Sequence, residues 1–353
     1  MTSTDPQLAE KGARMGLAAE IATREPFADV AARLKAAQSR ELDAVGEVIL
    51  EHLDSSVSLI PEVARHLMGA GGKRLRPLMT LSAAQVCGYQ GASHHHLAAA
   101  VELIHAATLL HDDVVDESAL RRGLRTANIV FGNKESVLVG DFLFARSFEL
   151  MVKTGSLKVL DILSQASCTI SEGEVLQLAT QSNVETTQKM YIDVISAKTA
   201  ALFGAATHAG AVLADAPERQ ERALADYGMN FGIAYQIVDD ALDYEGTEEA
   251  TGKSAGDDFR EGKMTLPVIL AIEAARSGEE RAFWQRTIGE GQREEDDFAR
   301  AQELMARDGL VERSLSMAED YAEAAATSLG ALPPSRLRDT LEDLALSSSV
   351  RAS

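Results

Sequence analysis

The sequence predicts an all-α protein on the basis of three observations. Alanine and leucine are abundant, whereas the 353 residues include only 8 prolines and 5% aromatic residues, a composition that favours helices. From Phe27 onward, apolar residues recur at helical spacing. Strand-like alternation of apolar and polar residues is not found along the sequence. We therefore expect one helical domain at residues 28–353, preceded by a polar, weakly patterned N-terminal tail at residues 1–27.

The composition also excludes several classes of function. The net charge of −20 argues against a nucleic-acid partner, because two polyanions repel each other. No apolar run reaches about 18 residues, so we expect no membrane span. The N-terminus lacks a hydrophobic signal core and carries acidic residues early, which makes the cytoplasm the expected location.

Helical periodicity places the individual elements. Helices are expected at residues 27–53, 59–68, 78–86, 97–119, 135–154, 158–181, 191–213 and 221–244, with acidic surface helices at 278–307 and two more at 310–344. Residues 123–133 should form a loop, and Pro333 and Pro334 should separate the last two helices. His94–His96 should be a solvated loop and helix start, because no carboxylate or cysteine stands at the spacing of a metal site.

A glycine-rich basic loop interrupts the helical pattern between Gly69 and Pro77. Glycines permit bends that expose backbone N–H groups, and Lys73, Arg74 and Arg76 add positive charge. Such a loop at a helix start is a candidate anion site. An ordinary basic turn accounts for the loop equally well when it is taken alone.

The apolar helix at 97–119 ends in three aspartates, Asp112, Asp113 and Asp116. Asp112 and Asp116 are one turn apart on the same face, where their charges repel unless a cation neutralises them. Paired carboxylates suit Mg²⁺, which binds one or two of them together with phosphate oxygens. Arg121 and Arg122 follow closely, and their planar guanidinium groups suit phosphate. The stretch therefore predicts a site for a metal-bridged diphosphate.

His105 lies two helical turns before Asp112 and shares its face, with Thr108 between them. A histidine on such a helix is more often a satisfied core residue. The shared face favours a place in the cavity beneath the aspartates.

A second aspartate cluster ends the helix at 221–244. Asp239, Asp240 and Asp243 repeat the first pattern 127 positions later, since 239 − 112 = 127, and Gln236 lies one turn before them. Carboxylates at a helix C-terminus oppose the helix dipole, so a cluster without metal would destabilise its helix. We interpret the two clusters as two walls of one metal site.

Three lysines extend this interpretation. Lys198, next to Thr199, stands in a small, apolar context where lysines need a partner; a phosphate and a core salt bridge are equally good candidates. The glycine-rich loop 252–263 is expected to be a mobile lid, with Lys253 and Lys263 contacting phosphate.

From about Phe27 to its end, the sequence resembles the trans-isoprenyl diphosphate synthases, which are head-to-tail prenyltransferases. The first aspartate motif with its Arg-Arg-Gly tail, the basic loop and the lysine loop all match. The second motif matches with Gly232 and Gln236, except that Ala241 replaces a larger apolar residue. The resemblance implies the isoprenoid synthase fold, an all-α bundle of about a dozen helices around a deep central cavity, usually as a homodimer.

The resemblance also implies roles for individual residues. Asp112 and Asp116 would bind two of three Mg²⁺ ions and Asp239 the third, supported by Asp113, Asp240 and Asp243. The allylic diphosphate would be held by Arg121, Lys198, Thr199, Gln236 and Lys253. Isopentenyl diphosphate would be held by Lys73, Arg76, His105 and Arg122, while Lys263 would assist closure.

Product length is expected to depend on the residues just before the first aspartate. Short-chain members of the resembled family carry a bulky aromatic there as a cavity floor, whereas this sequence has Ala107 and Thr108. The resemblance therefore implies a long all-trans product of about C40 to C50, of the kind used for quinone side chains, built from a primer such as farnesyl diphosphate.

Four other functions compete with a long-chain synthase as the interpretation of this sequence. A shorter product of about C15 to C20 would keep the same chemistry. A terpene cyclase would not need the basic loop or the second aspartate motif, and a regulatory subunit would be expected to lose aspartates that this chain keeps. A helical scaffold explains neither motif. Peripheral association with a membrane would suit a greasy product, although no basic amphipathic helix indicates it.

Overall fold

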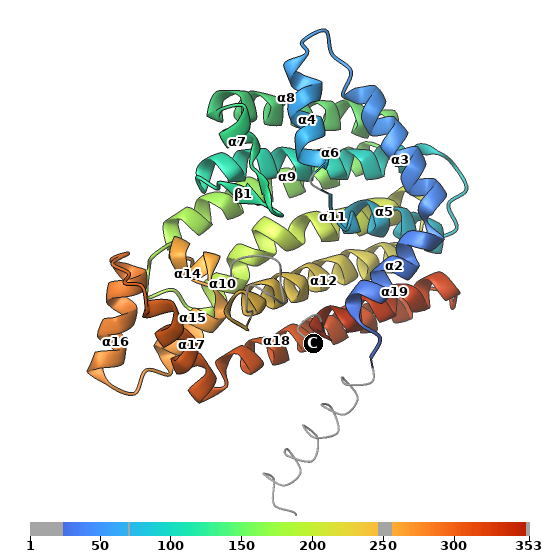
Figure 1. Ribbon diagram of the computed structural model, residues 1–353. Coiled ribbons are helices and arrows are strands. Elements are labelled where there is room, and N and C mark those ends of the chain that lie inside the picture. The colour runs from blue at the N-terminus through green and yellow to red at the C-terminus, as the bar shows by residue number, and fades with distance from the viewer. Residues whose placement is uncertain (1–23, 70, 246–255, 351–353) are drawn as a thin grey trace, which may run out of the picture.

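A computed structural model describes residues 24–69, 71–245 and 256–350. It confirms the all-α prediction, because long helices run side by side across the molecule (Figure 1). Within the described residues, none of the helices has the length and apolar character needed to cross a membrane.

The helices of the N-terminal two thirds are α2 (Phe27–Ala37), α3 (Ser39–His52), α4 (Leu59–Gly69), α5 (Leu75–Val86), α6 (Ser93–Val115), α7 (Ala127–Val130), α8 (Asn133–Lys153), α9 (Leu157–Thr180), α10 (Gln188–Ile195), α11 (Ala201–Leu213) and α12 (Glu218–Glu245). The rest are α14 (Asp257–Glu261), α15 (Leu266–Glu273), α16 (Gly278–Trp284), α17 (Asp297–Asp308), α18 (Leu310–Ser328) and α19 (Arg336–Ser347). Short π-helical turns at Ser196–Ala200 and Gln285–Gly289 and 3₁₀ turns at Leu329–Ala331 and Ser348–Val350 complete the list. The acidic helices at 278–307 and the two final helices are where the sequence predicts them.

The absence of strands is the first expectation that the structure corrects. Strands β1 (Leu120–Arg121) and β2 (Leu124–Arg125) pair antiparallel, with Leu120 opposite Arg125. The two residues between them, Arg122 and Gly123, both have positive φ angles (53° and 78°), as a tight hairpin turn requires. Two residues per strand are too few for a visible alternation, and the expected loop at 123–133 also contains the short helix α7.

Two further boundaries differ from expectation. The helix expected at 27–53 breaks at Gln38, whose buried side-chain amide donates to Oε1 of Gln85 at 2.7 Å. His94–His96 form the helix start that the sequence predicts, but they are not a solvated loop, because α6 already begins at Ser93 and the side chain of His94 is buried. Local periodicity misses both features, since each depends on a partner far away in the sequence.

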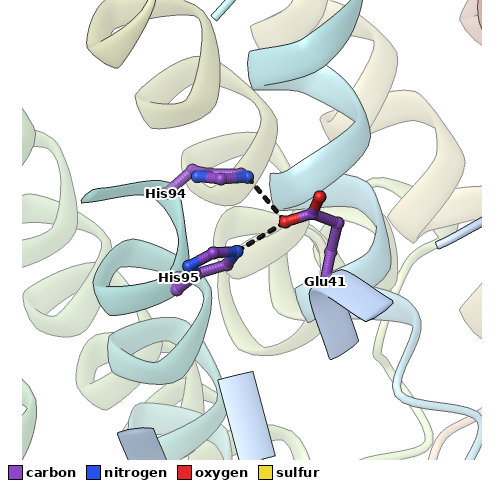
Figure 2. A group of neighbouring side chains, drawn as sticks. All are labelled: Glu41, His94 and His95. Carbon is purple, nitrogen blue, oxygen red and sulfur yellow. Dashed lines mark hydrogen bonds and ion pairs between the residues drawn. The ribbon is translucent and has the colours of Figure 1, made fainter. Parts of the chain in front are cut away.

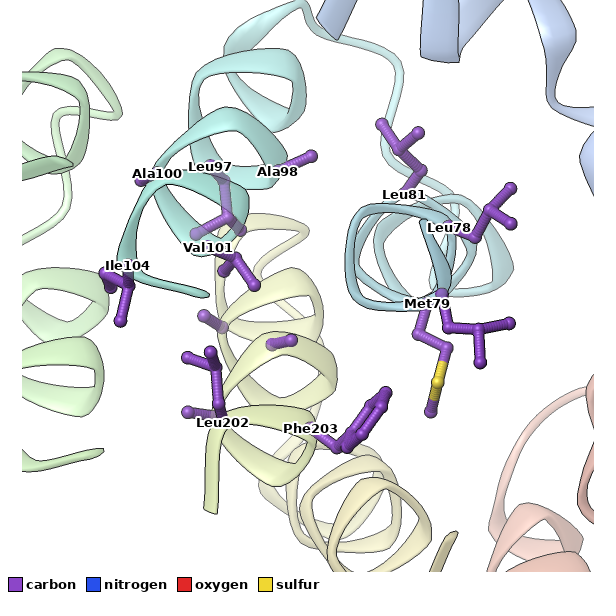
Figure 3. Close-up of a cluster of buried hydrophobic side chains, with 14 of the residues drawn as sticks. Leu78, Met79, Leu81, Leu97, Ala98, Ala100, Val101, Ile104, Leu202 and Phe203 are labelled. Atoms are coloured by element: carbon purple, nitrogen blue, oxygen red, sulfur yellow. The ribbon is translucent and has the colours of Figure 1, made fainter. Parts of the chain in front are cut away.

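The core that positions the site lies where α5, α6 and α11 meet (Figure 3). Leu78 and Met79 of α5, Val101 of α6 and Phe203 of α11 are buried against one another there. Both α6 and α11 are apolar on nearly every side, as helices in the middle of a bundle must be. The polar C-terminal end of α6 is thereby held at the edge of this core.

Candidate active site

A cavity of about 1600 Å³ opens between the C-terminal halves of α6 and α12. It exceeds the roughly 300–1,000 Å³ of common small-molecule pockets. Its lining includes these predicted site residues: Lys73, Arg76, His105, Thr108, Asp112, Asp116, Arg121, Arg122, Lys198, Thr199, Gln236, Asp239, Asp240, Asp243 and Lys263. The structure therefore brings together residues that the sequence predicts to act together.

Two predicted residues are placed differently, and a third lies outside the described residues. Asp113 and Ala107 are each only 1% exposed and do not line the cavity; Ala107 packs into the apolar core beside Thr108, which does line it. Lys253 lies outside the described residues.

The first wall of the cavity is the end of α6. Burial, together with the charges of Glu174 and Asp116, raises the pKa of Asp112 to about 7, although the Nζ atom of Lys198, 3.9 Å from Oδ2, opposes the rise. A carboxylate in this environment is stabilised by any additional positive charge. This wall therefore has the electrostatics of a cation site.

Asp113 faces away from the cavity and fixes an arginine. Its Oδ1 accepts hydrogen bonds from Nε and Nη2 of Arg121 at 3.0 and 2.7 Å. Its backbone carbonyl accepts a bond from Nδ2 of Asn128 at 3.0 Å. Because the pair is bidentate, it fixes the plane of the Arg121 guanidinium at the cavity edge.

The second wall is the end of α12. Oδ2 of Asp240 accepts a hydrogen bond from the Tyr191 hydroxyl at 2.7 Å, and Oδ1 accepts one from Nε2 of Gln236 at 2.7 Å. Burial still raises the pKa of Asp240 to about 7 despite these bonds. Gln236 in turn accepts a bond from the Thr199 hydroxyl at 2.9 Å. A continuous polar chain therefore joins α10, the π-helical turn at Ser196–Ala200 and α12 at this wall.

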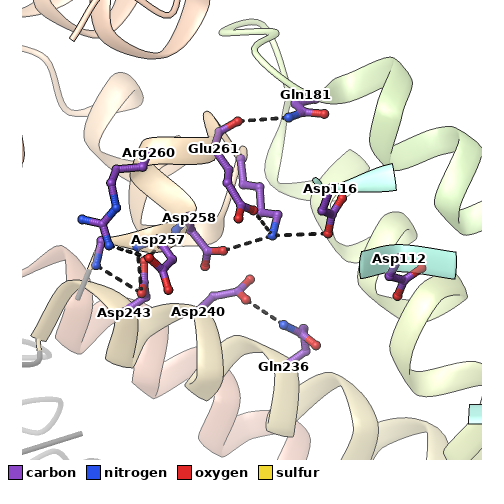
Figure 4. A network of polar contacts seen from close by, with 12 residues as sticks. Asp112, Asp116, Gln181, Gln236, Asp240, Asp243, Asp257, Asp258, Arg260 and Glu261 are labelled. Carbon is purple, nitrogen blue, oxygen red and sulfur yellow. Dashed lines mark hydrogen bonds and ion pairs between the residues drawn. The ribbon is translucent and has the colours of Figure 1, made fainter. Parts of the chain in front are cut away.

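Asp243 anchors the segment that follows the undescribed stretch. Its carboxylate accepts backbone N–H bonds from Gly256, Asp257 and Asp258 at 3.2, 3.3 and 3.0 Å (Figure 4). This role holds the start of α14 against the second wall.

Lys263 links α14 to the first wall. Its Nζ lies 2.5 Å from Glu261, 3.5 Å from Asp258 and 3.9 Å from Asp116 of the first wall. Burial alone would lower the pKa of Lys263, but the carboxylates of Asp258 and Glu261 more than offset that effect and raise it. The ammonium group is therefore charged and lies between α14 and Asp116 of the first wall.

The basic loop reaches the cavity beside α6. The guanidinium carbon of Arg76 lies 4.1 Å from the centre of the Phe203 ring, and Nη1 is 3.2 Å from Nε2 of His105. Burial, followed by the charge of Arg76, lowers the pKa of His105 well below its ordinary value. His105 is therefore neutral, and its Nε2 can accept a hydrogen bond from Arg76.

Lys198 and Thr199 lie on the π-helical turn between α10 and α11. An added Cβ at Gly173 of α9 would meet the backbone nitrogen of Lys198 at 2.7 Å, and one at Gly232 of α12 would meet Cα of Ala200 at 2.6 Å. The two glycines thus let α9 and α12 close on the turn from both sides. Nζ of Lys198 contacts Glu174 at 2.6 Å, so a salt bridge partners this lysine at the cavity wall.

Sequence reasoning missed Glu174, Tyr191 and Asp258 as members of this site. Glu174 and Tyr191 lie 24 and 49 residues from the groups that they contact, and none of the three belongs to an aspartate motif. The unusual context of Lys198 is the one signal that indicated a missing acidic partner.

Known proteins resemble this chain in sequence and in fold. Residues 57–305 match the polyprenyl synthetase family. Octaprenyl diphosphate synthase of Escherichia coli (strain K12) is 43% identical over 307 residues, which cover 87% of this chain and 94% of that protein. A polyprenyl synthase of Caulobacter crescentus CB15, crystallised with calcium and isoprenyl diphosphate, has a TM-score of 0.88 at 50% identity, covering 92% of this chain and 98% of that chain. A decaprenyl diphosphate synthase of Rhodobacter capsulatus has a TM-score of 0.88 at 51% identity, with 92% and 99% covered.

Proposed function

Because the chain belongs to the polyprenyl synthetase family, we propose that this protein is a trans-polyprenyl diphosphate synthase. It condenses isopentenyl diphosphate with an allylic diphosphate, head to tail, and repeats the step. The observation that carries the proposal is the pairing of two aspartate walls across one cavity that also receives the basic loop. A cation-rich, metal-binding cavity of this kind can stabilise the charge that a departing diphosphate develops.

The aspartate walls fit Mg²⁺. They present hard carboxylate oxygens, the donors that Mg²⁺ prefers. Burial raises the pKa of Asp112 and Asp240, so a bound cation would stabilise the charged form of each. Among the described residues, no three aspartates bring ligand oxygens within 4.8 Å of one another. Aspartate oxygens that are spread over both walls favour several ions over one. We propose three Mg²⁺ ions, held by Asp112 and Asp116 on the first wall and by Asp239 on the second. Bound Mg²⁺ would supply neutralising charge for the diphosphate leaving group.

The basic side chains divide into two groups. Arg121, Lys198, Thr199, Gln236 and Lys253 would hold the allylic diphosphate, and Lys73, Arg76, His105 and Arg122 would hold isopentenyl diphosphate. Support comes from the Arg76–His105 pair, which joins α5 to α6 two helical turns before Asp112. The alkene of isopentenyl diphosphate attacks the allylic carbon as its C–O bond breaks, and the proton then lost passes to the departing diphosphate. Apolar side chains of the cavity lining, among them Leu109, Ile170 and Leu202, would keep water from the positive charge that develops on the allylic carbon.

The product is proposed to be long, about C40 to C50, because the relatives include octaprenyl and decaprenyl synthases. Thr108 is small and lines the cavity one turn before Asp112, which leaves the path beneath the aspartates open. We further propose farnesyl diphosphate as the primer, a quinone side chain as the destination, and a cytoplasmic enzyme that releases its product at a membrane surface.

A homodimer is proposed on the basis of one exposed apolar face. Helices α8 and α9 pack together and leave large apolar side chains in contact with solvent, namely Val137, Leu138, Val152, Leu157, Val175 and Leu178. Large apolar side chains exposed on two packed helices favour an interaction surface there. Sedimentation velocity of the wild type and of Leu138→Asp tests it: the wild type should sediment as a dimer, and the variant as a monomer.

The function is tested by incubating the protein with labelled isopentenyl diphosphate, farnesyl diphosphate and Mg²⁺, and separating the dephosphorylated products by length. A ladder ending at about C40 to C50 supports the whole proposal. A stop at about C15 to C20 retains the reaction and refutes the open floor. Absence of Mg²⁺-dependent elongation with any allylic primer would refute the enzyme and favour a regulatory subunit.

A further inference from the structure

Outside the cavity, three side chains combine the chemistry of metal ligands with close spacing. They are Glu41 of α3 and His94 and His95 in the first turn of α6 (Figure 2). Nε2 of His95 lies 2.5 Å from Oε2 of Glu41, and Nε2 of His94 lies 3.2 Å from the same oxygen. All three ligand atoms fall within 4.8 Å of one another, which no other trio of histidine, cysteine, aspartate or glutamate achieves in the described part of the chain.

The protonation states favour metal ligation. Burial is the largest cause that lowers the pKa of His94, so its imidazole is neutral near pH 7. The hydrogen bond with His95 lowers the pKa of Glu41, which is therefore a carboxylate. A neutral imidazole nitrogen and a carboxylate oxygen are both donors that Zn²⁺ accepts, whereas the all-oxygen aspartate walls suit Mg²⁺.

The spacing is close to that of a tetrahedral ion. Zinc–ligand bonds of about 2.0–2.2 Å separate neighbouring ligand atoms by about 3.3 Å. His94 and Glu41 already stand at 3.2 Å, and the 2.5 Å contact of His95 would have to lengthen by about 0.8 Å. The side chain of Glu41 is 33% exposed, so it has room to make that adjustment and to leave a fourth position open to water.

From this geometry we propose that Glu41, His94 and His95 form a second metal site, for a divalent transition metal of the Zn²⁺ class, which joins α3 to α6. In the metal-bound form each imidazole would offer the lone pair of Nε2 to the metal and carry its proton on Nδ1. Nδ1 of His94 is buried and has no hydrogen-bond partner among the described residues, so it would carry an unsatisfied proton. We therefore expect micromolar rather than nanomolar affinity.

The site is structural rather than catalytic. His95 and Asp112 are 17 residues apart on α6, since 112 − 95 = 17, which corresponds to about 25 Å along the axis. Metal at Glu41 would tie α3 to the N-terminal end of the helix whose other end forms the first wall. Prenyl transfer in Mg²⁺ should proceed without it.

The test is a Zn²⁺ titration of the full chain against a chromophoric chelator, with Mg²⁺ in excess to fill the aspartate walls. His95→Gln keeps an N–H donor for Glu41 but removes the imidazole ligand, and Glu41→Gln removes the carboxylate. His96→Gln, which alters the adjacent histidine outside the trio, is the matched control. Thermal unfolding with and without Zn²⁺ is measured in parallel.

We expect the wild type and His96→Gln to bind one Zn²⁺ with equal affinity. His95→Gln and Glu41→Gln should bind Zn²⁺ at least tenfold more weakly. Zinc should raise the Tm of the wild type and of His96→Gln only. X-ray absorption of the zinc-loaded wild type should show two imidazole ligands, a readout that does not depend on any variant folding. Equal zinc affinity in all four proteins, or no zinc binding by the wild type, would overturn the site and leave a hydrogen-bonded link between α3 and α6. Prenyl transfer by the wild type and by His95→Gln is measured separately. If both are active, a failure to bind zinc overturns the metal site and leaves the proposed function standing.

Discussion

Replacing Gly173 by alanine should damage the site although no predicted substrate ligand is itself replaced. The new Cβ would lie 2.7 Å from the backbone nitrogen of Lys198 and 2.9 Å from Cβ of Ala197. Ordinary contact begins at 3.4 Å, so α9 and the π-helical turn must separate by about 0.7 Å, since 3.4 − 2.7 = 0.7. The clash is with backbone, which cannot rotate away as a flexible side chain could.

The size of the effect follows from packing and positioning. Overpacking of this kind costs about 1–3 kcal/mol, and at about 2 °C per kcal/mol for a chain of this size Tm should fall by about 2–6 °C. Lys198 and Thr199 move with the turn. Because misplacement by about 1 Å can cost about a hundredfold in rate, we expect kcat/KM for the allylic diphosphate to fall by about ten- to a hundredfold.

Gly46→Ala is the matched control for this experiment. Gly46 lies inside α3, and a Cβ there meets nothing within 4 Å. Alanine should therefore stabilise the protein by about 0.5–1 kcal/mol and leave kcat/KM unchanged. Initial rates and thermal unfolding of both variants give the comparison. A Gly173→Ala protein with the Tm and kcat/KM of the wild type would refute the argument that this glycine sets the approach of α9.

Three other substitutions test separate parts of the structure. Ala107→Phe and Thr108→Phe should shorten the product to about C15–C20, more strongly for Thr108, which lines the cavity; product chromatography measures this, and an unchanged length contradicts it. Tyr191→Phe removes a 2.7 Å hydrogen bond to buried Asp240; it should cost about 1–3 kcal/mol in urea unfolding and raise the Mg²⁺ concentration needed for half-maximal rate. Burial lowers the pKa of His208 in the folded state. Just below about pH 6.5, His208 is therefore protonated in the unfolded chain but still neutral in the folded protein. Because the unfolded state binds this proton more readily, the free energy of unfolding decreases as the pH falls through this range. The wild type should therefore lose more stability than His208→Gln between about pH 7.5 and 5.5, and equal losses would contradict this.

The long helices and both aspartate motifs could be predicted because their signals are local. The end of α6 and the end of α12 each carry apolar spacing followed by three aspartates, and no distant partner is needed to see that pattern. Placing both motifs in one cavity required the further argument that paired carboxylates need a shared cation. The structure confirms that they line the same cavity.

What the sequence did not indicate depends on contacts between distant segments. The partner of His95 is Glu41, 54 positions away on another helix, so no ligand spacing along the chain announces it. The hairpin at Arg122 depends on two left-handed residues rather than on alternation. Helical spacing also passes over the turn at Ser196–Ala200, because apolar periodicity tolerates a single extra residue without a visible break.

That turn makes the chain intolerant of a one-residue change in length at this point. A π-helical turn holds one residue more than the α-helix that would replace it. If one residue of Ser196–Ala200 were deleted, α10 would join α11 as a continuous α-helix, turned by about 100° relative to its present orientation. Tyr191 would then face away from Asp240, and the polar chain along the second wall would lose its first member. Insertions and deletions should therefore be tolerated in the surface connections of this protein and be rejected here, although the segment is helical on both sides.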